Sequence, residues 1–599
     1  MDSAGAAVGG ATLSLNGFLS LSRSDGSFAF QRLSVDTTYE LKASRDGLAS
    51  GVRLLRISSE EERVSIRLVI GPRIQFEDVT AKAGLDFTLA TGATGRFYQP
   101  EIMGGGVAAL DFDADGCTDI FFVNGAELRS GKKTGPAFHN KLYRNNCNGT
   151  FRDVTAESGL AGEVYGMGAG AADFDNDGFP DLLVTGLNGC HLYRNRGNGT
   201  FQEVTAEAGL GRVKDWTISA GWFDYDNDGW LDLFLTTYVE WDPGLDQCSA
   251  AGKPFYCHPR VYRPLANRLF HNNRNGTFTD VSGPSGIGKS LGKGMGVAFG
   301  DYDGDGWTDV FVANDSVPNF LFKNLGNGKF QEVALQTGVA YPANGNSIAG
   351  MGADFRDLNN DGHDDIAMTA MYFETFPLFR NQGKPAFFRD DTVSSGVALA
   401  TRNLTGWGMG IYDFDNDGNK DVFFATSHFP GSEPYVHMAA EIPNHLLLNA
   451  GNGTFTDVSE SAGSSFQQAA LFHGAAFADF DNDGRVDVIV TASNARARLY
   501  RNVSAPADHW IAFRLRGKTT NRDGIGARIQ VTLPNGSTRY NRVTTSVGYA
   551  SSSEPVVRFG LGPYDRVKQA VIRWPGGQVQ ILTDLPSGSI HAVTEGEKR

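Results

Sequence analysis

The stretch DFDNDGFPDLLVT, residues 173–185, decides the fold of this chain because versions of it recur six more times. Its first nine residues follow the pattern Asp-x-Asp/Asn-x-Asp-Gly-x-x-Asp. The other copies begin at Asp111, Asp224, Asp301, Asp357, Asp413 and Asp479. They lie about 60 residues apart on average, and a unit of this size that recurs along a chain indicates a repeat architecture.

Each acidic loop belongs to a longer shared unit with four β-type runs. A small residue stands five positions before the loop, and a short apolar run follows it. An aromatic-bearing run that ends in Asn comes next, as in LYRN (192–195), and an Asn-Gly turn leads into a last run, TFQEVT (200–205). Asn-Gly between two such runs is a strong signal for a hairpin, because both residues tolerate positive φ. Four short antiparallel strands per repeat predict one blade of a β-propeller.

The two ends of the array predict how the ring closes. The first unit is preceded by an isolated FEDVT (76–80), which matches the fourth strand of a blade. The last unit stops after LYRN (499–502) and lacks that strand. We therefore expect residues 76–80 to complete the last blade, which removes an open sheet edge. Seven loops and one divided unit predict an all-β fold with a seven-bladed propeller over residues 75–504.

The acidic loops have the composition of calcium sites. Side chains at positions 1, 3, 5 and 9 and a backbone carbonyl at position 7 provide only oxygen donors, which suit a hard cation. An EF-hand would place Glu at position 12, whereas all seven copies have an apolar residue there. We predict up to seven Ca²⁺ ions. Their ligands are Asp111, Asp113, Asp115, Cys117 and Asp119; Asp173, Asp175, Asp177, Phe179 and Asp181; Asp224, Asp226, Asp228, Trp230 and Asp232; Asp301, Asp303, Asp305, Trp307 and Asp309; Asp357, Asn359, Asp361, His363 and Asp365; Asp413, Asp415, Asp417, Asn419 and Asp421; and Asp479, Asp481, Asp483, Arg485 and Asp487, with position 7 acting through its carbonyl oxygen.

The alternative is that these loops are polar turns in which Asp and Asn bond their own backbone. Four carboxylates within nine residues repel one another unless a cation lies between them, which favours metal binding. The chain has 53 Lys and Arg against 68 Asp and Glu, a net charge of −15. Seven calcium ions would bring this to −15 + 14 = −1. So acidic a chain argues against nucleic acid as a partner.

The repeat resembles the FG-GAP/VCBS repeats of integrin-α-like propellers over residues 76–502. The resemblance implies the same fold, and it carries the family's metal ligands to the loop positions given above. Asn359 departs from the pattern and weakens the fifth site. Residues 508–599 resemble the ASPIC/UnbV domain that follows such propellers in cartilage-acidic-protein-like and bacterial proteins, on the motifs NRDGIGARIQVTLPNG (521–536) and VIRWPGGQVQ (571–580). Residues 1–74 resemble part of a carboxypeptidase-regulatory-like β-sandwich.

A few further features of the sequence bear on the expected disulfide and on the cellular location of the protein. Cys248 and Cys257 lie in a Gly- and Pro-rich insertion and are the expected disulfide, the alternative being two free thiols on a cytosolic loop. The first 23 residues contain no basic segment and no continuous apolar run, so they do not resemble a signal peptide. No apolar run is long enough for a transmembrane helix. The resemblance places the protein in the secreted, periplasmic or cell-surface class.

No catalytic motif is recognised, and we expect a non-catalytic module that binds a protein or a glycan. The alternative is a carbohydrate-active enzyme or lectin that uses a propeller face. His473 is expected to be a packing residue, and the set Asn521, Arg522, Asp523 and Glu554 to be structural. The acidic loops and Asn-Gly turns share one face, whereas the long connections, above all 237–266, share the other. We expect the partner on this second face; the alternative is that these insertions cap the channel or seat the C-terminal unit.

Overall fold

The computed structural model describes residues 7–16, 18–31, 33–34, 38–45, 48–49, 53–56, 71–250, 252–431, 438–505 and 509–597. Within these residues the chain is all-β, and its longest helix has 5 residues. The predicted N-terminal unit, residues 1–74, lies partly outside the described residues.

Each of the seven repeats folds into one four-stranded antiparallel sheet. The strands, in chain order within each sheet except the last, are β8 (Val107–Leu110), β9 (Asp119–Phe122), β10 (Lys141–Asn145) and β11 (Phe151–Asp153); β12 (Gly166–Ala172), β13 (Asp181–Gly186), β14 (Gly189–Asn195) and β15 (Phe201–Glu203); β16 (Thr217–Phe223), β17 (Asp232–Thr237), β22 (Arg268–Asn272) and β23 (Phe278–Asp280); β25 (Gly294–Gly300), β26 (Asp309–Asn314), β27 (Phe320–Asn324) and β28 (Phe330–Glu332); β29 (Ala353–Arg356), β30 (Asp365–Met368), β31 (Leu378–Asn381) and β32 (Phe388–Asp390); β33 (Gly406–Tyr412), β34 (Asp421–Thr426), β35 (His445–Asn449) and β36 (Phe455–Asp457); and β37 (Phe472–Ala478), β38 (Asp487–Ala492), β39 (Ala495–Asn502) and β7 (Phe76–Asp78).

The first strands of the seven sheets contact one another in a closed cycle. The order is β8, β12, β16, β25, β29, β33 and β37, and β37 returns to β8. The small residue before each acidic loop permits this approach, since a Cβ on Gly168 would lie 2.4 Å from the carbonyl oxygen of Ile218 and one on Gly352 would lie 2.2 Å from that of Trp407. This arrangement fits a β-propeller.

The divided last sheet is assembled as the sequence predicted. β7 pairs with β39 in antiparallel register, with Phe76 opposite Asn502 and Asp78 opposite Tyr500. Phe76 is buried and stacks on Phe466 with ring centroids 5.5 Å apart. An early strand and a late strand therefore join in one sheet, and neither leaves an unpaired edge there.

Short elements fill the connections. A helical turn follows the last strand of four sheets: α1 (Thr155–Ser158), α2 (Ser282–Ser285), α3 (Ala334–Thr337) and α4 (Val397–Thr401). The insertion after β17 forms β18 (Val239–Glu240), β19 (Ser249–Ala250), β20 (Lys253–Pro254) and β21 (Arg263–Ala266), and β21 pairs with β24 (Leu291–Gly292). The 3-10 helices are η1 (Gln99–Ile102), η2 (Pro136–Phe138), η3 (Leu210–Arg212), η4 (Pro259–Val261), η5 (Ile287–Lys289), η6 (Ser459–Ser461) and η7 (Pro575–Gly577).

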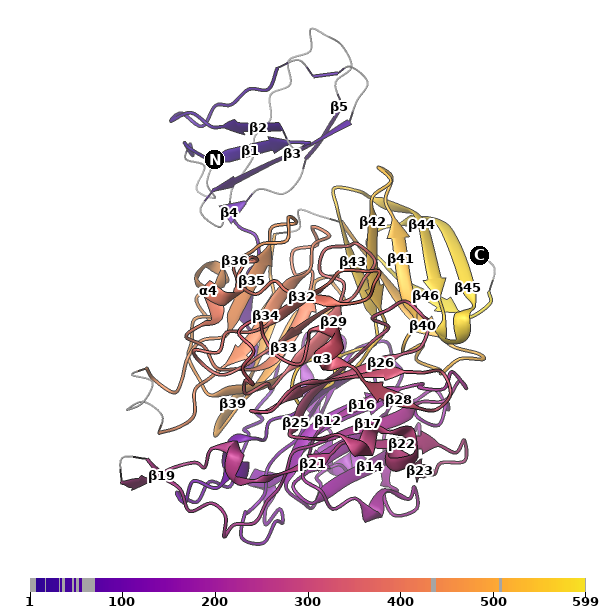
Figure 1. Cartoon of the computed structure of the whole chain (residues 1–599). Coiled ribbons are helices and arrows are strands. Elements are labelled where there is room, and N and C mark those ends of the chain that lie inside the picture. Colours follow the sequence, from indigo (N-terminus) through magenta and orange to yellow (C-terminus); the bar gives the residue numbers. More distant parts are fainter. Residues whose placement is uncertain are drawn as a thin grey trace.

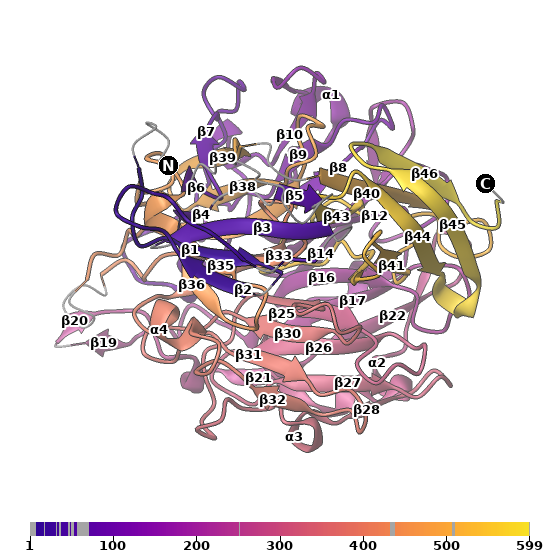
Figure 2. The ribbon, with the colours of Figure 1, turned by 90° about the horizontal axis from the view of Figure 1, so that it is seen from above.

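The C-terminal strands, yellow in both views, form two further sheets; they lie beside the repeats in Figure 1 and overlap part of them in Figure 2. One contains β43 (Val557–Gly562), β40 (His509–Arg516) and β46 (Ile590–Thr594), and the other β42 (Thr538–Arg542), β41 (Arg528–Thr532), β44 (Arg566–Arg573) and β45 (Val579–Pro586). Ile511, Phe513 and Ile529 are among the residues that build their buried core.

The segment between β42 and β43 enters the centre of the cycle of first strands. The N–H of Ala169 in β12 donates to the carbonyl of Ala550, at 3.0 Å. Ala353 in β29 exchanges two hydrogen bonds with Gly548. The Tyr549 hydroxyl donates to the carbonyl of Met103 at 2.6 Å, so residues 548–553 occupy the axis around which the seven sheets lie.

The described part of the N-terminal segment forms a sheet of six strands: β1 (Thr12–Leu15), β2 (Phe18–Leu21), β3 (Thr38–Arg45), β4 (Leu48–Ala49), β5 (Arg53–Arg56) and β6 (Gly71–Pro72). Alternate residues of β1 are buried, as expected for a strand with one face on a core. The Tyr564 hydroxyl donates to the Glu40 carboxylate, which links this sheet to the C-terminal strands.

Candidate metal centres

All seven acidic loops connect the first strand of a sheet to its second and share one set of hydrogen bonds. In the second loop the N–H groups of Asp177 and Gly178 donate to the two oxygens of Asp173, at 3.0 and 2.7 Å. The N–H of Phe179 donates to Asp177 Oδ1 at 3.0 Å, and that of Phe174 to Asp181 Oδ2 at 3.1 Å. The corresponding bonds are present in the other six loops.

Two loop positions adopt positive φ in every copy. Position 6 is Gly throughout, with φ between 88° and 100°. Position 4 is Asn in five copies, Gly in one and Ala114 in the first, all in the left-handed region. Gly and Asn adopt this region at low cost, which explains their place in the motif. The apolar residues at position 12 are buried, so each loop runs into a core strand as the sequence predicted.

The carboxylates at position 3 have buried oxygens that no hydrogen bond satisfies. Among the described residues, the Oδ1 atoms without a hydrogen-bond partner belong to Asp113, Asp175, Asp226, Asp303 and Asp481. A buried carboxylate oxygen without a donor is costly, and an ion that is not drawn is one of its ordinary explanations. The fifth loop differs, because the amide of Asn359 donates to Asp361 at 2.7 Å. The donor set therefore fits a hard divalent cation in the first four loops and in the seventh, and fits it less well in the fifth. In the sixth loop Asp415 Oδ2 also lacks a hydrogen bond from the described residues, but it pairs with Arg73.

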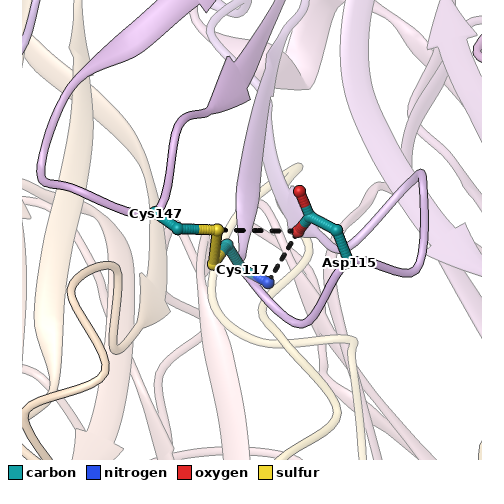
Figure 3. Close-up of side chains that lie close together, drawn as sticks. All are labelled: Asp115, Cys117 and Cys147. Atoms are coloured by element: carbon teal, nitrogen blue, oxygen red, sulfur yellow. Dashed lines mark hydrogen bonds between the residues drawn. A yellow bond between two sulfur atoms is a disulfide. The ribbon is translucent and has the colours of Figure 1, made fainter.

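The loop carboxylates converge closely enough for shared coordination. Oxygen atoms of Asp173, Asp175 and Asp181 lie within 4.8 Å of one another, and equivalent trios occur in other loops. In the first loop Asp115 also approaches Cys117 and Cys147, but those two sulfurs are joined in a disulfide (Figure 3). Disulfide sulfurs lack the thiolate charge that binds metals, so the first loop offers oxygen ligands like the others.

Basic side chains partly balance the loops. Arg144, from the third strand of its sheet, binds Asp113 and Asp115 at 2.5 and 2.9 Å. Leu448 occupies the equivalent position of the sixth sheet, and there Arg73 from the N-terminal segment binds the position 3 and 5 carboxylates instead, at 2.5 and 2.9 Å. One base against four carboxylates leaves each such loop with an excess of negative charge.

The position 9 carboxylates are the most buried. Burial raises the pKa of Asp119 and of Asp365 to about 8, and the neighbouring loop carboxylates add to the rise. Burial also raises the pKa of Asp232, to about 7. A divalent cation among these oxygens would oppose the rise, because an opposite charge favours the ionised form. A cation bound in these loops would therefore be coupled to the protonation of their carboxylates.

An Asn at the end of each third strand links neighbouring loops, a role that the sequence analysis did not recognise. Asn195 Nδ2 donates to the carbonyl of Pro180 in its own loop at 3.0 Å and to that of Phe112 in the preceding loop at 2.8 Å. The same bridge recurs in all seven sheets, and Asn145 extends it to Phe480 across the closure. The invariance of Asn in the aromatic-bearing runs was the available signal.

The C-terminal strands lie against the acidic-loop face. The N–H of Asp173 donates to Asp523 at 2.9 Å, and that of Arg522 to Asn176 at 2.8 Å. Glu554 accepts from the N–H of Asp479 at 3.0 Å. These polar residues thus join the C-terminal unit to the loops, which supports the structural interpretation of them. The alternative, in which the long insertions cap the channel or seat the C-terminal unit, keeps support, because Tyr549 packs in one buried cluster with Cys257 and Tyr262 of the longest insertion.

Two further predictions concern His473 and the cysteines. His473 is buried beside the axis, with Nδ1 2.8 Å from the carbonyl oxygen of Gly104 and its ring stacked on Trp407. It is a packing residue, as expected. The predicted disulfide between Cys248 and Cys257 is confirmed, and the second one, Cys117–Cys147, was not predicted.

Comparison with protein families agrees with this geometry. The FG-GAP-like repeat model matches residues 111–184, 173–235, 261–312, 301–368, 357–424 and 413–490, which together cover more than half of the chain and include every acidic loop. The chain belongs to the FG-GAP-like repeat family. This FG-GAP-like protein also contains an ASPIC and UnbV domain, matched over residues 517–599.

Curated relatives of this FG-GAP-like protein include cartilage acidic protein 1. The mouse protein is 23% identical over 506 residues and the human protein 24% identical over 506 residues, in each case over 82% of this chain. The Xenopus tropicalis protein is 26% identical over 330 residues, 53% of this chain. The matches span 64%, 62% and 47% of these relatives, so the chain covers less than two thirds of their length.

Solved structures resemble the FG-GAP-like protein only weakly. An Agrocybe aegerita lectin, described as recognising non-reducing terminal N-acetylglucosamine, aligns with a TM-score of 0.36 and 16% identity over 59% of this chain and 79% of its own. An exotype rhamnogalacturonan lyase aligns with a TM-score of 0.28 and 14% identity over 98% of this chain and 86% of its own. Similarity at this level supports no statement about ligand or activity.

Proposed function

We propose that this protein is an extracytoplasmic, calcium-binding, seven-bladed β-propeller that binds a protein or glycan ligand without catalysis. The propeller comprises residues 75–504, flanked by a small N-terminal β unit (1–74) and the C-terminal β unit (508–599). The closed cycle of first strands and the pairing of β7 with β39 support this architecture. The chain's place in the FG-GAP-like repeat family supports it independently.

One observation carries the calcium assignment: the buried, unpartnered Oδ1 atoms at position 3 of five loops. Carboxylate oxygens of the same loop lie near that atom, and the motif adds the position 7 carbonyl, so all candidate donors are oxygen. Oxygen-only shells of this kind suit Ca²⁺ rather than the softer transition metals. The ligands would be the seven sets of loop positions 1, 3, 5, 7 and 9 given above, the fifth with Asn359 and a lower affinity. The ions would be structural, because each would lie in the loop that connects the first and second strands of its sheet.

An oxidising compartment fits the cysteines. Cys117 and Cys147 are joined, as are Cys248 and Cys257, and Cys190 is buried. Disulfides of this kind persist in secreted and periplasmic proteins and are rare in the cytosol. Among the described residues, no helix has the length and apolarity that a membrane crossing requires.

The ligand is expected on the face opposite the acidic loops. The C-terminal strands already cover much of the loop face, whereas the long connections between second and third strands form the other face. The insertion that carries β19 and β20 extends from the body there (Figure 1). Long loops on a rigid scaffold are a common place for binding.

Two measurements test this function together. Elemental analysis after dialysis against calcium should give close to seven ions per chain, and the Asp177→Ala variant should lose about one of them. Replacing residues 243–260 with a short Gly-Ser turn should abolish binding on a glycan array or to candidate proteins while calcium content stays unchanged. A chain without bound calcium at millimolar concentration would contradict the metal assignment. Undiminished binding after the loop replacement would contradict the ligand face.

A further inference from the structure

A cavity of about 640 Å³ opens among the long connections on the face away from the acidic loops. Its walls come from η1, from the insertion closed by the Cys248–Cys257 disulfide, and from the connections that carry Asp315 and Glu374. Trp407, beside the axis, also lines it. The volume lies within the range of small-molecule sites, and connections from several sheets of the ring contribute to it.

Two carboxylates line this cavity and are held in place by hydrogen bonds. Asp315 is 5% exposed and accepts from the Tyr238 hydroxyl at 2.6 Å and from Ser316 Oγ at 2.8 Å. Glu374 Oε2 accepts from the N–H groups of Ala349 and Met371, at 2.9 and 3.2 Å. A carboxylate offers about four acceptor positions, so each group keeps capacity for further donors.

Gln99 is a third polar residue of the cavity wall. Gln99 is 4% exposed, and its Oε1 atom makes no hydrogen bond with the described residues. Gln99 belongs to η1, whose first N–H is fixed by Asp246 at 2.9 Å. A buried amide oxygen without a donor costs free energy unless something else supplies one. The atom is itself enclosed by protein, so Gln99 shapes the cavity wall but offers no accessible acceptor to the cavity.

The backbone beside both carboxylates is held in an uncommon conformation. Ser316, next to Asp315, has φ of 60°, and Phe373 and Thr375, on either side of Glu374, have φ of 67° and 60°. Positive φ is energetically unfavourable for residues other than glycine, and residues in this conformation are concentrated at functional sites. The strain therefore falls on the positions that fix the two acceptors in the cavity wall.

The remaining lining combines apolar surface with moderate positive charge. Trp407 is stacked on His473, with ring centroids 4.3 Å apart, and meets Phe429 edge to face, so the orientation of its ring is fixed. Arg260 and His258 line the cavity. Lys293 lies behind the lining, where it donates to the carbonyl of Pro259 at 2.7 Å. The carboxylates disfavour an anion and the basic groups disfavour a compact cation. A neutral ligand rich in hydroxyl donors and with one apolar face fits best.

We propose that this cavity binds one neutral pyranose residue of a glycan, whose hydroxyl groups donate to Asp315 and Glu374 and whose C–H face packs on the aromatic wall. The proposal rests on the proposed function, since it names the ligand class of the same face. It adds that recognition is by a cavity rather than by the exposed tip of the insertion.

The test uses the calcium-loaded full chain on an array of neutral, acidic and amino glycans, with titration of each bound glycan. We expect neutral glycans to bind, and Glu374→Gln and Asp315→Asn each to raise the dissociation constant about tenfold or more, because each replaces a charged acceptor with a weaker neutral one. The matched control is Glu207→Gln, an exposed carboxylate elsewhere, which should leave the affinity unchanged. Unchanged calcium content and melting temperature show that each variant is folded.

The outcomes separate this inference from the wider function. Binding of neutral glycans that persists at full affinity in both variants overturns the cavity assignment but leaves a glycan-binding propeller. Binding of acidic or amino glycans alone, or of choline as a cation probe, overturns the ligand class. A calcium-loaded chain that binds nothing on the array overturns the inference and leaves the protein-binding form of the proposed function.

Discussion

The Asn bridge between neighbouring loops gives a sharp prediction for the variant Asn195→Ala. Asn195 is 1% exposed, and its amide donates to two carbonyls, Phe112 O and Pro180 O. Truncation leaves both carbonyls without a donor, at about 1–2 kcal/mol each, so the free energy of unfolding should fall by about 3 kcal/mol. The control Asn198→Ala removes an exposed Asn of the same sheet that accepts only from Thr200, and it should cost less than about 1 kcal/mol.

Equilibrium urea denaturation at saturating calcium, followed by tryptophan fluorescence, measures both variants. Hydrogen exchange adds a spatial test, because the bridge joins two loops. In the Asn195→Ala variant, amides should exchange faster in residues 111–119 of the preceding loop as well as in residues 173–181. A free-energy loss no larger than that of the control, or faster exchange in residues 173–181 alone, would refute the idea that these Asn residues couple adjacent loops.

Calcium removal should lower the melting temperature. At a calcium concentration about ten times the dissociation constant, each site adds about 1.4 kcal/mol to the free energy of unfolding, and seven sites add roughly 10 kcal/mol. A melting temperature that EDTA does not change would contradict this. Burial raises the pKa of Asp119 and Asp365 to about 8, so in the calcium-free form the folded protein holds these two protons more tightly than the unfolded chain does. This contribution to stability is fully present at low pH and is lost as the pH rises through about 8. Calcium-free protein should therefore melt lower at about pH 8.5 than at about pH 6, and a pH-independent melting point would contradict it. The double variant Cys117→Ser/Cys147→Ser removes a disulfide between residues 30 positions apart, and its free energy of unfolding, measured by urea denaturation, should be about 3–4 kcal/mol lower. A chain truncated after residue 505 should bind the dye ANS strongly, since the axis loses Tyr549 and its neighbours; dye binding equal to that of the full chain would count against this.

The sequence predicted the features that local pattern controls. The Asp and Gly positions of each loop required one turn geometry, and that geometry is present in all seven copies. FEDVT (76–80) could be assigned to the last sheet because every other unit had its own fourth strand. Cys248 and Cys257 could be paired because they are nine residues apart in one insertion.

The features that were missed depend on contacts between distant segments. Cys117 pairs with Cys147 because loop position 7 packs against the Asn-Gly turn of the same sheet, as Phe179 lies against Gly197. No spacing rule reveals this packing. The entry of residues 548–553 into the axis leaves no periodic signal, and the cavity-lining residues Gln99, Asp315 and Glu374 come from three separate connections. Such arrangements follow from the assembled ring rather than from any one repeat.

The position of residues 548–553 has a consequence for biosynthesis. Every strand of the ring, including β7 and β39, has been translated before this segment leaves the ribosome. Until then the inward-facing Met167, Met295, Met351 and Trp407 have no Tyr549 to cover them. A chain that terminates early would contain all seven repeats and still expose an apolar channel, the type of surface that chaperones and proteases recognise. The apolar channel is therefore covered only in chains whose translation has continued through residues 548–553.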